Sequence, residues 1–83
     1  YRVEITASAE RALVRLPKDG LVRVVKAIRE LATVPRPAGC RKFKGHDDVY
    51  RIRVGVYRVI YSIDDRRIVV VVLKVGHRKD VYD

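Results

Sequence analysis

The fold is decided by residues 49–61, which read VYRIRVGVYRVIY. Side chains of a β-strand alternate between two faces, and here apolar or aromatic residues alternate with arginines. Gly55 in the middle predicts a turn, so the stretch predicts an antiparallel hairpin with one apolar and one basic face. The basic face carries Arg51, Arg53 and Arg58. Such a grouping of cations indicates an anionic partner, of which a nucleic-acid backbone is the first candidate.

The composition is typical of one globular domain. The chain has 83 residues, of which 48% are hydrophobic and 35% charged, and we expect residues 1–83 to form a single domain. Its formal net charge of +9 predicts attraction to polyanions that weakens as salt rises. No apolar run approaches the roughly 20 residues of a membrane helix, and no signal peptide is recognisable. The lone Cys40 cannot form an internal disulfide, so we expect a cytoplasmic protein with no membrane partner.

The first half of the chain predicts one strand and two helices. Residues 1–6 alternate as a strand does. Ser8 is the predicted N-cap of a short helix that ends at Pro17. Apolar residues at helical spacing then predict a second helix over residues 18–33. Two consecutive helices with a short connection form a hairpin, which can cover one face of a sheet.

The second half predicts the rest of the sheet. A short strand is expected at residues 40–44, a turn at 45–48, the hairpin next, and another turn at 64–65. Residues 68–75 are apolar at every position but Lys74, as in a central strand buried on both faces. The order of elements predicts an α+β domain, a small twisted, largely antiparallel sheet with an N-terminal two-helix hairpin packed on one face. The other face, or part of it, is expected to stay open.

The residues that carry chemistry are mainly basic. Neither a glycine-rich phosphate loop nor metal-ligand spacing is present in the sequence, so we expect no metal and no organic cofactor. Arg78 and Tyr82 follow the last predicted strand and can come up beside the basic face. Guanidinium groups clamp phosphates and stabilise charge in a phosphoryl transition state, and an RNA 2′-hydroxyl is a built-in nucleophile. Spacing alone also fits a solvated or merely RNA-binding face.

Three segments resemble a known family. They are ITASAERALVRLP at residues 5–17, KFKGHDDVYRIRVGVYRVIYSID at residues 42–64 and VGHRKDVY at residues 75–82. Together they are similar to the RelE/ParE toxins of type II toxin–antitoxin systems, and the terminal arginine followed by a tyrosine resembles the RelE branch. The resemblance implies a RelE-like fold and a ribosome-dependent endonuclease that cleaves mRNA in the ribosomal A site through attack of the 2′-hydroxyl.

The resemblance also implies site residues and partners. The catalytic positions that it implies are Arg51, Arg53, Arg58, Arg78 and Tyr82. We expect RNA binding from their basic neighbours, Lys42, Lys44, Lys74, His77 and Lys79. The implied partners are mRNA, the ribosome with its 16S rRNA, and a cognate antitoxin whose acidic and hydrophobic segment wraps the toxin.

The chain departs from the RelE pattern at two positions. Arg51 and Arg53 stand where that pattern has lysines, one of them a proposed general base, and arginine is a poor proton acceptor. We therefore hypothesise that His77, Tyr82 or a nearby lysine takes part of that role. Two other functions stay open: a ParE-like inhibitor of DNA gyrase without nuclease activity, and an inactive basic RNA-binding domain.

Overall fold

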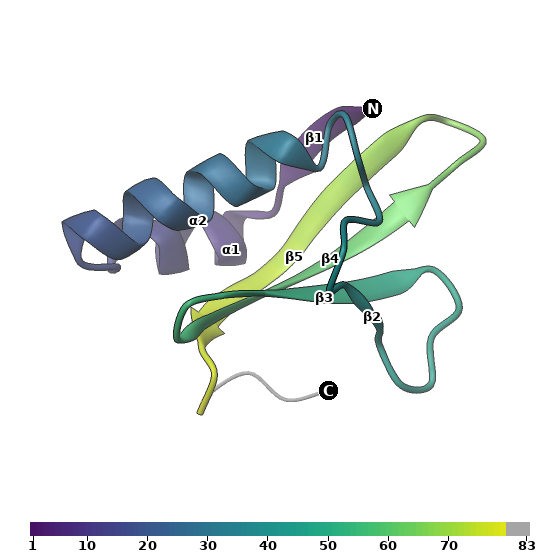
Figure 1. Cartoon of the computed structure of the whole chain (residues 1–83). Helices are drawn as coiled ribbons and strands as arrows, with labels where there is room; N and C mark the ends of the chain where they lie inside the picture. The colour runs from purple at the N-terminus through teal and green to yellow at the C-terminus, as the bar shows by residue number, and fades with distance from the viewer. Residues whose placement is uncertain (80–83) are drawn as a thin grey trace.

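The computed structural model describes residues 1–79, which form two helices and five strands (Figure 1). Along the chain these elements are β1 (Arg2–Ile5), α1 (Ala7–Val14), α2 (Lys18–Glu30), β2 (Arg41–Lys42), β3 (Val49–Val54), β4 (Tyr57–Asp64) and β5 (Val69–His77). None of the helices within residues 1–79 is long and apolar enough to span a membrane.

The strands form one sheet in the order β1-β5-β4-β3-β2. Within residues 1–79, β1 and β5 are the one parallel pair, and the chain between them includes both helices and the strands β2 to β4. The other neighbours are antiparallel, which confirms the predicted largely antiparallel sheet. The turn between β3 and β4 consists of Gly55 and Val56, and Gly55 has a φ of 61°. Positive φ at the first position of a two-residue hairpin turn favours glycine.

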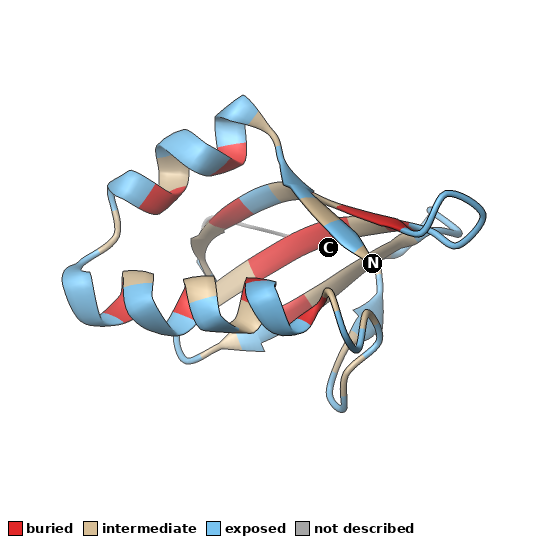
Figure 2. Ribbon diagram, turned by 90° about the horizontal axis from the view of Figure 1, so that it is seen from above, coloured by how far each residue is buried: buried red, intermediate tan, exposed pale blue. Residues whose placement is uncertain are grey.

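Both helices cover the same face of the sheet, as the buried residues that face one another in Figure 2 show. Leu13 of α1 and Val24 and Ile28 of α2 pack into the core against the sheet. The sheet contributes alternate residues of β4, including the fully buried Val59 and Tyr61. Among residues 1–79, no helix or strand packs on the opposite face, so the predicted α+β architecture is confirmed.

Three predicted helix boundaries were wrong, the first because α1 ends at Val14 and not at Pro17. The N-cap of α1 is Thr6 and not Ser8, because the helix starts directly after β1 and the Thr6 hydroxyl accepts a hydrogen bond from the Ala9 amide at 3.1 Å. The second helix ends at Glu30 and not at residue 33. Residues 31–33 instead donate to the carbonyl groups three residues earlier, which tightens the last turn.

The prediction that residues 68–75 are buried on both faces was only partly right. Val70 and Val72 are fully buried under the helices. On the opposite face Val71 and Leu73 are half-buried, and Lys74 is exposed. An apolar run indicates a strand of this kind but does not reveal whether a second layer covers it.

Candidate nucleic-acid interface

The hairpin register places the three predicted arginines on one face of the sheet. Arg53 of β3 lies directly opposite Arg58 of β4, and Arg51 lies opposite Ile60. Ile52 and Val59 form the pair between them and point into the core on the helix side. Because side chains alternate along each strand, the arginines point away from the helices.

Two further cations join this face. Arg41 of β2 lies opposite Arg51, and Lys74 of β5 lies opposite Ile60. With these two residues added to the three hairpin arginines, the basic face consists of Arg41, Arg51, Arg53, Arg58 and Lys74. The sequence prediction missed Arg41, since its partner in the sheet depends on how the chain between β2 and β3 folds.

A shallow hollow lies at the β2 side of the basic face. It has a volume of about 410 Å³ and is lined by Gly39, Arg41, Arg51 and Arg53. Gly39 has a φ of 88°, and apart from Gly39 and its two chain neighbours no atom of the described residues lies within 4 Å of the position that a Cβ would take there. The hollow is therefore positively charged and open above Gly39.

The arginines differ in how firmly the fold holds them. Arg53 is exposed, whereas Arg51 and Arg58 are half-buried. The Nε atom of Arg58 is shielded from solvent, so the inner part of this side chain is packed and only its outer part can reach a ligand. A packed guanidinium loses less conformational freedom when it binds a phosphate than a fully exposed one.

A β-bulge decides which residues of β5 reach the basic face. Val59 pairs with Val75 and Ile60 with Lys74, but Tyr61 pairs with Val72, so β5 contains one additional residue between these pairs. Simple alternation from Val72 would turn Lys74 toward the helices. The bulge reverses the alternation and turns Lys74 onto the basic face.

The same bulge separates His77 from the arginines. His77 lies opposite Tyr57, and the two rings meet edge to face with centroids 6.1 Å apart. Tyr57 packs against the core, so His77 is on the helix side of the sheet. Its Nδ1 accepts a hydrogen bond from the Lys79 amide at 3.2 Å. The structure does not bring His77 together with the basic face.

The chain after β5 is fixed beside the hairpin turn. The amide of Arg78 donates a hydrogen bond of 2.8 Å to the Val56 carbonyl. This bond keeps the backbone that carries Arg78 next to the end of the hairpin, where Arg53 and Arg58 form the last cationic pair. The Arg78 side chain is exposed.

The remaining predicted site residues are spread over the surface. Lys42 lies opposite Tyr50, which faces the core, and its Nζ is 3.9 Å from an Asp47 carboxylate oxygen. Lys44 and Lys79 are exposed in turns. The prediction for Tyr82 lies outside the described residues.

A polar cluster ties the segment after α2 to the far end of the sheet. The Arg36 guanidinium donates hydrogen bonds of 3.3 and 2.9 Å to the Asp65 carboxylate, and the Tyr1 hydroxyl donates one of 2.6 Å. These bonds, that from Arg36 first, hold the pKa of Asp65 below its usual value. The buried Tyr61 hydroxyl donates to the Pro35 carbonyl at 2.7 Å, and burial raises the pKa of Tyr61. The cluster fixes the end of the hairpin that is remote from Arg58.

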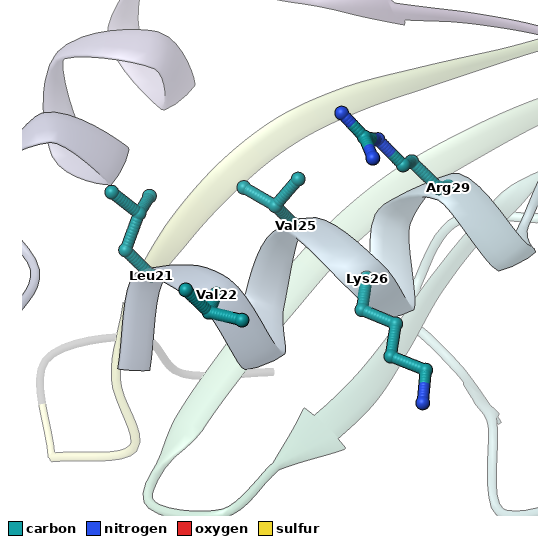
Figure 3. Close-up of a pocket in the computed structure, with 5 residues that line it drawn as sticks. All are labelled: Leu21, Val22, Val25, Lys26 and Arg29. Carbon is teal, nitrogen blue, oxygen red and sulfur yellow. The ribbon is translucent and has the colours of Figure 1, made fainter. Parts of the chain in front are cut away.

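A second surface lies on the outer side of α2 (Figure 3). Leu21, Val22 and Val25 line an apolar pocket there, bordered by Lys26 and Arg29. Val22 is 61% exposed and contributes apolar surface to the outside of the helix. An apolar surface with a cationic border is typical of a protein-binding site.

Comparisons with known proteins agree with this architecture. A family model described as ParE toxin of type II toxin-antitoxin system, parDE, matches residues 3–82. Toxin RelG of Mycobacterium tuberculosis is 37% identical over 83 residues, covering 99% of this chain and 95% of that protein. Putative toxin RelE1 of Methanocaldococcus jannaschii is 33% identical over 87 residues, covering 99% and 94%.

The fold is also similar to that of a solved toxin. In the crystal structure of the archaeal RelE–RelB complex from Pyrococcus horikoshii OT3, the matching chain is 35% identical with a TM-score of 0.85 and 98% of each chain covered. The resemblance seen in the sequence is thus confirmed. The chain belongs to the RelE/ParE superfamily of type II toxin–antitoxin toxins and is RelE-like.

Proposed function

We propose that this toxin inhibits translation as a ribosome-dependent endoribonuclease that cuts mRNA in the A site, without a metal or organic cofactor. The observation that carries the proposal is the pairing of Arg53 with Arg58 on a face that also holds Arg51, beside the anchored Arg78. The RelE-like relatives support the same activity. Its partners are then mRNA and the ribosome with its 16S rRNA, and its place of action is the cytoplasm.

The proposed reaction is a transesterification within the RNA. The 2′-hydroxyl attacks the adjacent phosphorus, the bond to the 5′-oxygen breaks, and a 2′,3′-cyclic phosphate and a 5′-hydroxyl form. One proton leaves the 2′-hydroxyl and one is given to the departing 5′-oxygen. Arg58, Arg53 and Arg78 supply positive charge to the phosphate as charge develops on its oxygens.

Proton transfer needs a group other than an arginine. Lys74 and Tyr82 are the candidates that we retain, and Lys74 lies on the basic face across Ile60 from Arg51. His77 fits this role less well, because it lies on the helix side and its Nδ1 already accepts a backbone hydrogen bond. We propose that Arg51, with exposed Lys42, Lys44 and Lys79, contributes to attraction of RNA.

Primer extension tests the proposal. Ribosomes programmed with mRNA and an empty A site are incubated with wild-type toxin, with Arg58→Ala and with Arg11→Gln, an exposed position on α1. We expect cuts within A-site codons that require ribosomes, a rate lower by roughly 10²–10³-fold in Arg58→Ala, and no loss in Arg11→Gln. Equal rates for the two variants, with both folded, would contradict the role of Arg58.

Gyrase inhibition is the second candidate, because the matching family model is described for the ParE toxin of parDE. It predicts that supercoiling by purified gyrase is blocked, that the block persists in Arg58→Ala, and that no RNA is cut. RNA binding without any cleavage or gyrase effect would instead indicate an inactive basic domain.

We also propose that a cognate antitoxin binds the α2 surface of Figure 3. The archaeal neighbour is a RelE–RelB complex, and an acidic segment with apolar residues would complement Val22 and Val25 between Lys26 and Arg29. Val22→Glu, which adds a charge at an exposed position, is expected to weaken antitoxin binding and leave RNA cleavage unchanged. Calorimetric titration with the antitoxin measures the first effect, and unaltered affinity would exclude this surface.

A further inference from the structure

We propose that Arg41 and Arg51 form a phosphate-binding subsite for the backbone of single-stranded RNA, next to the phosphate that is cut at Arg53 and Arg58. The inference deepens the proposed function, since it names how the RNA strand continues beyond Arg58. Its new element is Arg41, which lies on the short strand β2 outside the hairpin that the sequence singled out.

The sheet register gives the subsite its direction. Arg41 faces Arg51 across β2 and β3, and Arg53 faces Arg58 across β3 and β4. Neighbouring strands are about 4.8 Å apart, so these cations follow one another across roughly 10 Å of sheet, from Arg58 to the edge. A nucleic-acid backbone that leaves Arg58 in this direction meets a positive charge on each strand.

The hollow between β2 and β3 provides the space. Its lining is mainly polar, and three of the four lining residues are arginines. Gly39, the fourth, leaves the hollow open because no described atom crowds the position of a Cβ. The hollow lies beside β2, the last strand of the described sheet, so a bound strand can continue past this edge.

The position of Arg41 on the edge strand has one alternative explanation. Cations on an edge strand discourage association between sheets. That role would be served by either residue of β2 and would not require a hollow beside Arg41.

Binding of uncleavable RNA tests the subsite without relying on catalysis. Fluorescence anisotropy with a short 2′-O-methyl single-stranded RNA, measured over a range of salt concentrations, gives affinity and its salt dependence. Arg41→Gln is expected to bind roughly 3- to 10-fold more weakly at low salt, with a slope of log K against log salt that is shallower by about 0.7, the value for one phosphate contact. Arg41→Lys keeps the charge and should keep the slope.

Arg11→Gln is the matched control, because it removes one exposed positive charge from α1 on the opposite side of the sheet. A loss confined to Arg41→Gln supports the subsite. Equal losses in Arg41→Gln and Arg11→Gln, no loss in either, or stronger Arg41-dependent binding of duplex DNA than of RNA would overturn it. If wild-type toxin cuts no mRNA but Arg41→Gln alone weakens RNA binding, the subsite holds and the proposed nuclease function fails.

Discussion

The contact between α2 and the hairpin makes a sharp prediction for Gly20→Ala. Gly20 is buried in the first turn of α2, directly against the ring of Tyr57. A Cβ at this position would lie 2.6 Å from Cε2 of Tyr57 and 3.0 Å from its Cζ and hydroxyl oxygen. The shortest of these separations is below any normal carbon–carbon contact, so the ring or the helix must move.

Two opposing effects set the size of the change. Alanine is better than glycine in a helix by about 0.8–1.0 kcal/mol, and overpacking a core costs about 1–3 kcal/mol. The Tyr57 ring also meets the His77 ring edge to face, which restrains its rotation. We expect the overpacking to win by about 1 kcal/mol, which lowers the melting temperature by roughly 4–8 °C in a domain of this size.

A double-mutant cycle with Tyr57→Leu isolates the contact. In the Tyr57→Leu background the ring is gone, and Gly20→Ala should stabilise the protein by about 0.8–1.0 kcal/mol through helix propensity alone. Urea denaturation of the four proteins gives the coupling free energy, expected at about 2 kcal/mol, the sum of the loss in the wild type and the gain in the Tyr57→Leu background. If Gly20→Ala stabilises both backgrounds equally, α2 does not approach Tyr57 as described and the reasoning is refuted.

Three further predictions concern Tyr61, Asp65 and His77. Tyr61→Phe removes the hydrogen bond to the Pro35 carbonyl and should cost about 1 kcal/mol of stability at neutral pH. Burial raises the pKa of Tyr61, so the stabilisation by Tyr61 is present below about pH 10 and is lost as pH rises through the folded-state pKa. In thermal melts at alkaline pH, the variant should therefore lose stability less steeply than the wild type. The pKa of Asp65 is lowered in the folded state, so the stabilisation by Asp65 is present above about pH 3.9 and is lost as pH falls through the folded-state pKa. Asp65→Asn should therefore make stability depend less steeply on pH at acidic pH. An unchanged pH dependence of stability at acidic pH would contradict the pairing of Asp65 with Arg36. His77→Asn keeps a hydrogen-bond acceptor for the Lys79 amide and should keep RNA cleavage near the wild-type rate. His77→Phe keeps a ring against Tyr57 but loses the acceptor, and the cleavage rate should fall by up to about 10²-fold through displacement of Arg78. Equal losses of cleavage rate in both variants would indicate a direct chemical role for His77.

The hairpin could be predicted because its faces follow from a local rule. Alternation along residues 49–61 assigns each side chain to a face, and the turn at Gly55 sets which residues oppose one another. Arg51, Arg53 and Arg58 therefore lie together as expected. The helix ends were less predictable, because Thr6 competes with Ser8 as a cap and the connection to β1 decides between them.

The rest of the site depends on contacts between distant segments. Arg41 reaches the basic face through pairing with Arg51, which no local pattern in the sequence specifies. His77 was expected near the arginines because it follows the last predicted strand, and alternation from Val72 would agree by turning His77 away from the helices. The bulge in β5 inverts that alternation, and a bulge leaves no clear signal in a run of valines.

The bulge is stabilised by hydrogen bonds from the residue that directly follows β1, the strand that pairs with β5. The Thr6 hydroxyl, which caps α1, also donates a hydrogen bond of 3.1 Å to the carbonyl of Leu73, and the Thr6 amide donates one of 3.0 Å to the carbonyl of Val72. One residue at the start of α1 thus fixes both the helix and the irregular part of β5. A substitution at Thr6 that removed the bulge would turn Lys74 toward the helices and His77 toward the arginines, although no residue of the basic face itself would be substituted. The basic face is therefore determined jointly by the hairpin alternation and by the hydrogen bonds that Thr6 makes to β5 at the end of β1.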